Sequence, residues 1–125
     1  MQDVTLKGAR ILVVEDEVLI AMDIEQICRE WGADDIVVAR SLDRAQAEAQ
    51  AGPFDLVVLD LFLSGETTVE FAADLTAGGT PFVLTSGYAD AEALLGATAG
   101  RPIVEKPFLA ETLVAAMAQA IGRDP

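Results

Sequence analysis

Histidine is absent from this chain of 125 residues, cysteine occurs once, and lysine and arginine together supply only eight positive charges. Without histidine, a metal site would be built from oxygen ligands, which favours a hard ion. The one cysteine, Cys28, cannot form a disulfide within the chain, and this fits a reducing cytoplasm. Because 21 acidic residues leave a net charge of −13, direct nucleic-acid binding is disfavoured.

Long apolar runs are also missing, although hydrophobic residues make up 52% of the sequence. No stretch reaches the roughly 18 consecutive apolar residues that a membrane span needs, and the first residues show no signal-peptide pattern. The length fits one domain and leaves no room for a second module of ordinary size. We therefore expect a soluble cytoplasmic protein without a membrane partner, a single domain over residues 1–125, and an ordered core of about 8–122. Any output then passes through a partner protein.

Strand-like apolar runs alternate with helix-like periods along the whole sequence. The expected strands lie at residues 10–14, 35–39, 54–59, 81–85 and 101–105. The expected helices lie at residues 20–31, 41–52, 67–77 and 109–121, with a weak element rich in alanine, glycine and threonine at 89–100. Leu109, Leu113, Met117 and Ile121 form the apolar stripe expected on the last helix. This alternation is typical of an α/β fold in which helices cover both faces of a parallel sheet.

Polar side chains follow four of the expected strands, at the point where each strand ends. Glu15 and Asp16 follow the first, Asp60 ends the third, Ser86 follows the fourth and Lys106 the fifth. In open parallel sheets the ligand site lies beyond the carboxyl ends of the strands, so these residues would meet. Three carboxylates in one place raise one another's pKa and therefore need a cation. Mg²⁺ suits such an oxygen set, and a carboxylate can attack phosphorus to form an acyl phosphate.

Each of these residues also has an ordinary structural interpretation. A carboxylate after a strand commonly shapes a turn or caps a helix, Ser86 precedes a glycine as turn residues do, and Lys106 fits a solvated surface charge. For any one residue alone, this interpretation is the better one. For the site to have no function, every one of these ordinary interpretations would have to be correct at once, at the ends of four strands. That coincidence is improbable, and it favours a functional site.

The order and spacing of these residues resemble the response-regulator receiver family of two-component signalling, and the resemblance covers essentially the whole chain. The matching residues are the acidic pair Glu15-Asp16, the aspartate Asp60, the hydroxyl residue Ser86 and the pair Lys106-Pro107. The resemblance implies a flavodoxin-like (βα)5 fold, a doubly wound parallel sheet with strand order 2-1-3-4-5.

The resemblance also implies the role of each residue. Asp60 would be the phosphoacceptor, and Ser86 and Lys106 would hold the phosphoryl oxygens, with Ser86 moving toward the phosphate on activation. The implied Mg²⁺ ligands are Asp16, Asp60, the backbone carbonyl of Phe62 and, through water, Glu15.

Two segments depart from the common receiver pattern. Ile103 stands where an aromatic switch residue usually lies on the fifth strand. This puts in doubt the usual coupling between the hydroxyl residue after the fourth strand and that aromatic residue. Residues 81–88 resemble the receivers named for a Pro-Phe-x-Phe-Ala-Thr-Gly-Tyr motif, with proline, phenylalanine, glycine and tyrosine in agreement. Tyr88 would then be the switch aromatic, or else an aromatic half-buried over the weak element. Residues 63–66, Leu-Ser-Gly-Glu, replace the proline-containing turn of other receivers and also resemble this subgroup.

The resemblance implies a phosphoacceptor rather than an enzyme, with autophosphorylation from small donors and autodephosphorylation. A histidine kinase or a phosphotransfer protein would donate the phosphoryl group, and a downstream protein would bind the activated form. Two other classes stay open: an interaction module that works without phosphorylation, and a phosphatase that forms an aspartyl phosphate. Dehalogenase-type phosphatases carry a second aspartate where this chain has Phe62. The sequence does not choose between a phosphorelay shuttle, a phosphate sink and a regulator of a partner.

Overall fold

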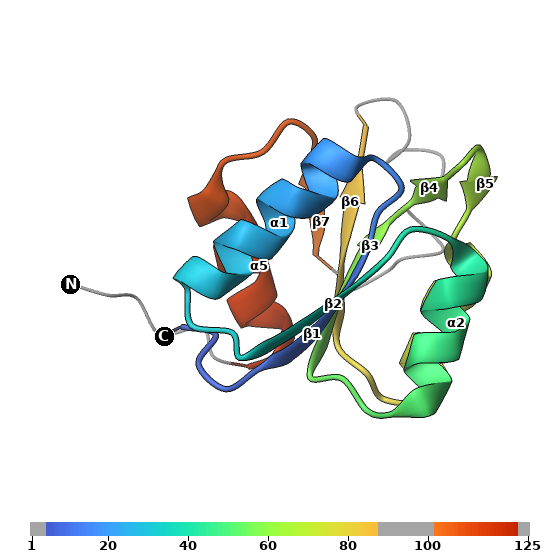
Figure 1. Ribbon diagram of the computed structural model, residues 1–125, viewed down its shortest axis with the longest axis horizontal. Coiled ribbons are helices and arrows are strands. Elements are labelled where there is room, and N and C mark those ends of the chain that lie inside the picture. Colours follow the sequence, from blue (N-terminus) through green and yellow to red (C-terminus); the bar gives the residue numbers. More distant parts are fainter. Residues whose placement is uncertain (1–4, 88–101, 123–125) are drawn as a thin grey trace.

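A five-stranded parallel sheet forms the centre of the protein, seen in a computed structural model that describes residues 5–87 and 102–122 (Figure 1). Its strands are β1 (Arg10–Val14), β2 (Asp35–Ala39), β3 (Leu56–Asp60), β6 (Phe82–Ser86) and β7 (Ile103–Glu105). They lie in the order β2-β1-β3-β6-β7, and every neighbouring pair is parallel. Counted along the chain, this is the predicted order 2-1-3-4-5, so the flavodoxin-like fold is confirmed.

Helices cover both faces of this sheet. The described helices are α1 (Val18–Glu30), α2 (Leu42–Ala51), α3 (Val69–Ala77) and α5 (Ala110–Ala120). Figure 1 shows α1 and α5 on one side of the sheet and α2 on the other. Buried residues of α3 join the α2 side of the core. The weak element expected at residues 89–100 lies outside the described residues.

The two faces of the sheet bury separate apolar clusters, because successive strand residues point to opposite faces. On β1, Ile11 and Val13 pack against α1 and α5, whereas Leu12 and Val14 pack against α2 and α3. This explains the continuous apolar runs of the strands, which are buried on both sides. Cys28 lies in the first cluster, and burial raises the pKa of its thiol to about 12, in agreement with a core role.

Local hydrogen bonds fix several element boundaries. The hydroxyl of Ser41 accepts a bond from the Arg44 N–H at 3.2 Å and caps α2, as its position predicts. The third strand begins at Leu56 and includes Asp60, rather than covering 54–59. Before it, the Asp55 carboxylate accepts a bond from the N–H of Arg10, and the Arg10 guanidinium stacks over Phe54. The N–H of Asp55 also donates to the Arg10 carbonyl at 2.8 Å, so this segment is tied to β1 although the regular strand starts one residue later.

Two further features differ from the sequence predictions. Strands β4 (Phe62–Leu63) and β5 (Glu66–Thr67) form a small antiparallel hairpin that was not expected. On the last helix, Leu113 and Met117 are buried, but Leu109 is 71% exposed at the N-cap position. Leu109 therefore does not belong to the core-facing stripe, because that stripe begins only one turn into α5. Within the described residues, none of the helices has the length and apolar character needed to cross a bilayer.

Candidate functional site

The carboxyl ends of β1, β3, β6 and β7 meet at one edge of the sheet. Glu15 and Asp16 follow β1, Asp60 is the last residue of β3, Ser86 is the last residue of β6, and Lys106 follows β7. The N–H of Lys106 donates to the carbonyl of Ser86 at 2.8 Å, which joins the last two strand ends. The side chains that the strand pattern places at this edge therefore lie on neighbouring strand ends.

Three carboxylates form the centre of this edge. One oxygen each from Glu15, Asp16 and Asp60 lies within 4.8 Å of the others. Beside them is a pocket of about 280 Å³ whose wall includes Asp16, Asp60, Phe62 and Lys106. Such a set of oxygen donors beside a pocket fits a hard divalent cation such as Mg²⁺. Phe62, whose carbonyl is an implied ligand, lies at the same pocket.

Lys106 supplies the positive charge that the carboxylates need. Its Nζ atom donates to Glu15 Oε1 at 2.6 Å and to Asp60 Oδ2 at 3.0 Å. Burial alone would lower the pKa of Lys106, but the bonds to Glu15 and Asp60 outweigh burial and raise the pKa above its ordinary value. Lys106 is therefore a permanent cation in this site.

Glu15 is the most deeply placed carboxylate of the three, with no exposed surface. Burial raises the pKa of its carboxyl to about 7, and bonds from Lys106 and from the N–H of Glu17 offset this only in part. The structure thus gives Glu15 a direct contact with Lys106, a partner that the sequence did not indicate. Its role as a metal ligand through water stays a prediction.

Asp60 is held on both carboxylate oxygens and on its backbone. The N–H of Phe62 donates to Oδ1 at 3.2 Å, while Lys106 binds Oδ2. The hydroxyl of Thr68, which is almost fully buried, donates to the Asp60 carbonyl at 2.7 Å. Sequence reasoning missed Thr68 because the helix expected at residues 67–77 includes it, whereas α3 begins only at Val69. The Thr68 hydroxyl stabilises the end of β3.

Asp16 is held by residues from two distant segments. The N–H and the hydroxyl of Ser64 both donate to Asp16 Oδ2, at 2.9 and 3.3 Å, and the Arg40 guanidinium reaches the Asp16 carbonyl at 3.4 Å. Burial opposes the charged carboxylate, but several hydrogen bonds, the largest of them from the Ser64 N–H, together outweigh burial and lower the pKa of Asp16. Neither Ser64 nor Arg40 was indicated as a site residue by the sequence.

Two hydroxyl groups at the end of β6 are buried and lack a partner among the described residues. They belong to Thr85 and Ser86. A buried donor without a partner costs about 1–3 kcal/mol, and such groups in native proteins commonly mark a ligand site. The buried Ser86 hydroxyl without a partner agrees with a role in which it donates to an oxygen of a ligand. Tyr88, the other predicted switch residue, lies outside the described residues.

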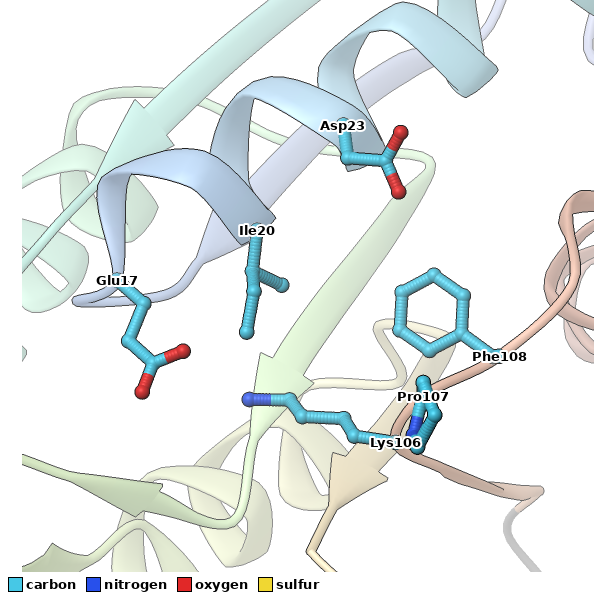
Figure 2. Close-up of a pocket in the computed structure, with 6 residues that line it drawn as sticks. All are labelled: Glu17, Ile20, Asp23, Lys106, Pro107 and Phe108. Carbon is cyan, nitrogen blue, oxygen red and sulfur yellow. The ribbon is translucent and has the colours of Figure 1, made fainter.

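A second hollow of about 340 Å³ adjoins Lys106 (Figure 2). Its lining comes from α1 and from the segment after β7: Glu17, Ile20, Asp23, Lys106, Pro107 and Phe108. In Figure 2 the stem of Lys106 passes beneath Ile20, and its ammonium end lies on the side of Glu17. The same two segments carry exposed apolar side chains: Val18, Leu19 and Met22 on α1, and Leu109 after Phe108. Both segments that line the hollow therefore also present apolar surface.

Known proteins share both the sequence pattern and the fold. Residues 11–118 match the family described as response regulator receiver domain. The chain is 30% identical over 106 residues to the transcriptional regulatory protein YvrH of Bacillus subtilis, covering 82% of this chain and 45% of that protein. It is 26% identical over 117 residues to PdtaR of Mycobacterium tuberculosis, covering 91% of this chain and 57% of that protein. The chain thus spans about half the length of these curated relatives.

Solved structures agree with this result. The response regulator PhyR from Brucella abortus superposes with a TM-score of 0.79 at 29% identity, covering 95% of this chain and 50% of PhyR. A response regulator receiver protein from Sinorhizobium medicae superposes with a TM-score of 0.82 at 25% identity, covering 94% of this chain and 97% of that protein.

Proposed function

This chain belongs to the response regulator receiver domain family, and from that premise we propose that it accepts a phosphoryl group on Asp60 in the presence of Mg²⁺. A change of conformation then carries the signal to a partner protein. One observation supports this most strongly: the buried Asp60 shares a site with Glu15 and Asp16, and its Oδ2 atom is bound by Lys106. We propose this phosphoacceptor role rather than an enzyme with a substrate of its own.

Asp60 is the proposed nucleophile because its carboxylate is already oriented. The bonds from the Phe62 N–H and from Lys106 fix its rotamer, while the Thr68 hydroxyl fixes its backbone. An Asp60 oxygen attacks phosphorus as the bond from phosphorus to the donor nitrogen or oxygen breaks, and this yields an acyl phosphate. Mg²⁺, held by Asp16, Asp60 and the Phe62 carbonyl, would neutralise charge on the transferring oxygens.

Lys106 and Ser86 are proposed to bind the phosphoryl group after transfer. The Lys106 ammonium now bonds to Asp60 Oδ2, and a phosphoryl group on Asp60 would offer it new oxygens within a short reach. The Ser86 hydroxyl, which has no hydrogen-bond partner among the described residues, would donate to a phosphoryl oxygen. Because both residues sit at adjoining strand ends, the new charge biases the position of the segment that follows β6. A downstream protein would recognise that change.

The direct test is to incubate the protein with acetyl phosphate and to measure its intact mass, first with Mg²⁺ and then with an excess of chelator. We expect a gain of one phosphoryl group with Mg²⁺ and a rate at least about tenfold lower with chelator, because the oxygens of the incoming group then meet three carboxylates without a divalent cation. If the metal makes no difference to the rate, the proposed Mg²⁺ site is wrong.

The face of α1 beside the site is proposed to dock the phosphodonor, a histidine kinase or a phosphotransfer protein. Leu19 and Met22 are 80% and 59% exposed, and a large apolar side chain with that exposure suits a protein interface. On α1 these residues alternate with Ile20 and Asp23, which line the hollow over Lys106, so a protein bound to α1 could present a phosphohistidine to Asp60.

Replacing Leu19 with alanine should slow phosphotransfer from such a protein donor by roughly five- to tenfold, because the three carbon atoms removed contribute about 0.8 kcal/mol each when fully buried and about half of that burial accounts for the factor. Labelling by acetyl phosphate should stay unchanged, because a small donor needs no docking surface. The two rates are compared by intact mass on the same preparations. Normal transfer from a protein donor would exclude this face as the docking site.

A further inference from the structure

The turn of the β4–β5 hairpin directs two hydrogen-bond donors at one carboxylate oxygen. The N–H and the hydroxyl of Ser64 both reach Asp16 Oδ2, although the two residues are 48 positions apart in the chain. We propose that Ser64 is a positioning residue: it holds the Asp16 carboxylate in the place where Mg²⁺ is taken up. This inference rests on the proposed function, because it gives Asp16 the role of a metal ligand.

The hairpin is built so that these donors are available. Phe62 pairs with Thr67 and Leu63 with Glu66, so only Ser64 and Gly65 remain in the turn. Both turn residues have positive φ, 52° and 83°, as two-residue hairpin turns of the primed type require. The ladder ends at Leu63 and Glu66, which leaves the Ser64 N–H to bind outside the hairpin.

The hairpin is itself fixed to the core. Leu63 is 2% exposed and belongs to the apolar cluster under α2 and α3. At the base of the hairpin, the N–H of Thr68 donates to the carbonyl of Leu61 at 3.0 Å. The position of Ser64 is therefore set by buried neighbours, even though Ser64 itself is exposed. An anchor of this kind can restrain a more mobile carboxylate.

Asp16 needs such a restraint because it lies in the loop after β1 and is only partly buried. Its neighbours in the cluster are the carboxylates of Glu15 and Asp60, and like charges at this distance repel. Repulsion favours rotation of the Asp16 side chain toward solvent, which the two bonds from Ser64 oppose. Both bonds fall on Oδ2, so Ser64 itself places no donor on Oδ1.

The test measures Mg²⁺ affinity by titration calorimetry and stability by urea unfolding, in the full chain. Ser64→Gly removes the hydroxyl donor but keeps the N–H and accepts positive φ without strain. We expect its dissociation constant for Mg²⁺ to rise by roughly three- to tenfold, less than the roughly 10- to 100-fold typical of residues that orient metal ligands, because the N–H donor is kept. Its urea midpoint should stay close to that of the wild type.

Gly65→Ala is the matched control because it strains the same turn and keeps both donors of Ser64. A Cβ at residue 65 would meet nothing within 4 Å, but φ of +83° is unfavourable for alanine. We expect a lower urea midpoint and a Mg²⁺ affinity within about twofold of the wild type. An affinity loss as large as that of Ser64→Gly would show that turn stability alone matters, and would overturn the positioning role.

A spectroscopic measurement reports on the contact directly. In the metal-free protein, the amide proton of Ser64 should resonate downfield because it donates to a carboxylate, and Asp16→Asn should move it upfield. An unmoved resonance would contradict the contact. Equal Mg²⁺ affinity in Ser64→Gly and the wild type would overturn the role of Ser64 and leave the proposed function standing. A wild-type chain that binds no Mg²⁺ would contradict both.

Discussion

Replacing Asp60 with asparagine should abolish the gain of a phosphoryl group from acetyl phosphate, measured by intact mass in the presence of Mg²⁺. The amide has nearly the same shape as the carboxylate, but its single oxygen can accept only one of the two bonds, either from the Phe62 N–H or from Lys106. It carries no charge and is a very poor nucleophile, so the acyl phosphate cannot form. We expect the fold to persist, because the Thr68 hydroxyl contacts the backbone carbonyl of residue 60 and not its side chain.

The matched control is Asp55→Asn, which removes a carboxylate one residue before the same strand. Asp55 is exposed and accepts a bond from the Arg10 N–H at 2.8 Å, a contact that an asparagine can keep. This variant should gain mass as the wild type does. An equal gain in Asp60→Asn would refute the assignment of the phosphoacceptor.

The same variant separates the alternative functions. If a partner binds Asp60→Asn as tightly as it binds the phosphorylated wild type, then the chain is an interaction module that works without phosphorylation. If the purified wild type turns over phosphate esters, the phosphatase class gains support. Phe62 argues against that class, because it occupies the position at which those phosphatases carry a second aspartate. Its N–H donates to the carboxylate of Asp60.

The sheet could be predicted from sequence because its signal is repeated and local. Each strand carries a short apolar run, and each is followed by a helical period, so five weak indications agree on one topology. The placement of Asp60 and Lys106 followed from the same argument, because the carboxyl ends of parallel strands share an edge. The burial of Ser86 and the gathering of the three carboxylates agree with this shared edge of the sheet.

The contacts that orient the site could not be predicted in this way. Strands β4 and β5 have two residues each, too few to show a period. Ser64 therefore looked like irregular chain, although it reaches Asp16. Thr68 and Arg40 act through backbone carbonyls of distant residues, and no sequence spacing encodes such a bond.

Ile103 stands where receivers commonly carry an aromatic residue on the fifth strand. It is half-buried and packs against the cluster that includes Phe82 and Leu84, on the α2 and α3 side of the sheet. A β-branched side chain is restricted in its rotation about the Cα–Cβ bond. The doubt about the usual coupling therefore stands, and the role of Tyr88 stays a prediction.

Replacing Lys106 with methionine should destabilise the metal-free protein by about 2–4 kcal/mol, because two buried carboxylates then lose their cation. Both contacts of the ammonium are short, 2.6 Å to Glu15 and 3.0 Å to Asp60. Methionine keeps a similar length and apolar stem, so little packing is lost. Added Mg²⁺ should recover much of the loss, since the cluster without lysine is more negative and binds a divalent cation more tightly.

The loss should also depend on pH, with a sign that follows from Glu15. In the wild type, burial raises the pKa of this carboxyl to about 7, above the ordinary value of 4.5. The opposing bond from Lys106 is gone in the variant, so its pKa rises further. A carboxyl group whose pKa is raised in the folded state costs folding free energy that grows from the unfolded pKa to the folded pKa and is constant above it. Below about pH 7 Glu15 is protonated in both folded proteins, so the difference between them arises at higher pH. The deficit of Lys106→Met should therefore be smaller at about pH 7 than at about pH 9.

Urea unfolding with and without Mg²⁺, at about pH 7 and about pH 9, measures both effects. Arg44→Met is the matched control: it removes one positive charge from the exposed face of α2, where its pair with Glu48 spans 3.9 Å. A surface pair of this kind contributes about 0–1 kcal/mol and should respond to neither Mg²⁺ nor pH in this way. If Lys106→Met is as stable as Arg44→Met without metal, then the contacts of Lys106 do not stabilise the cluster. If instead Mg²⁺ stabilises Lys106→Met no more than the wild type, then the three carboxylates do not form the cation site.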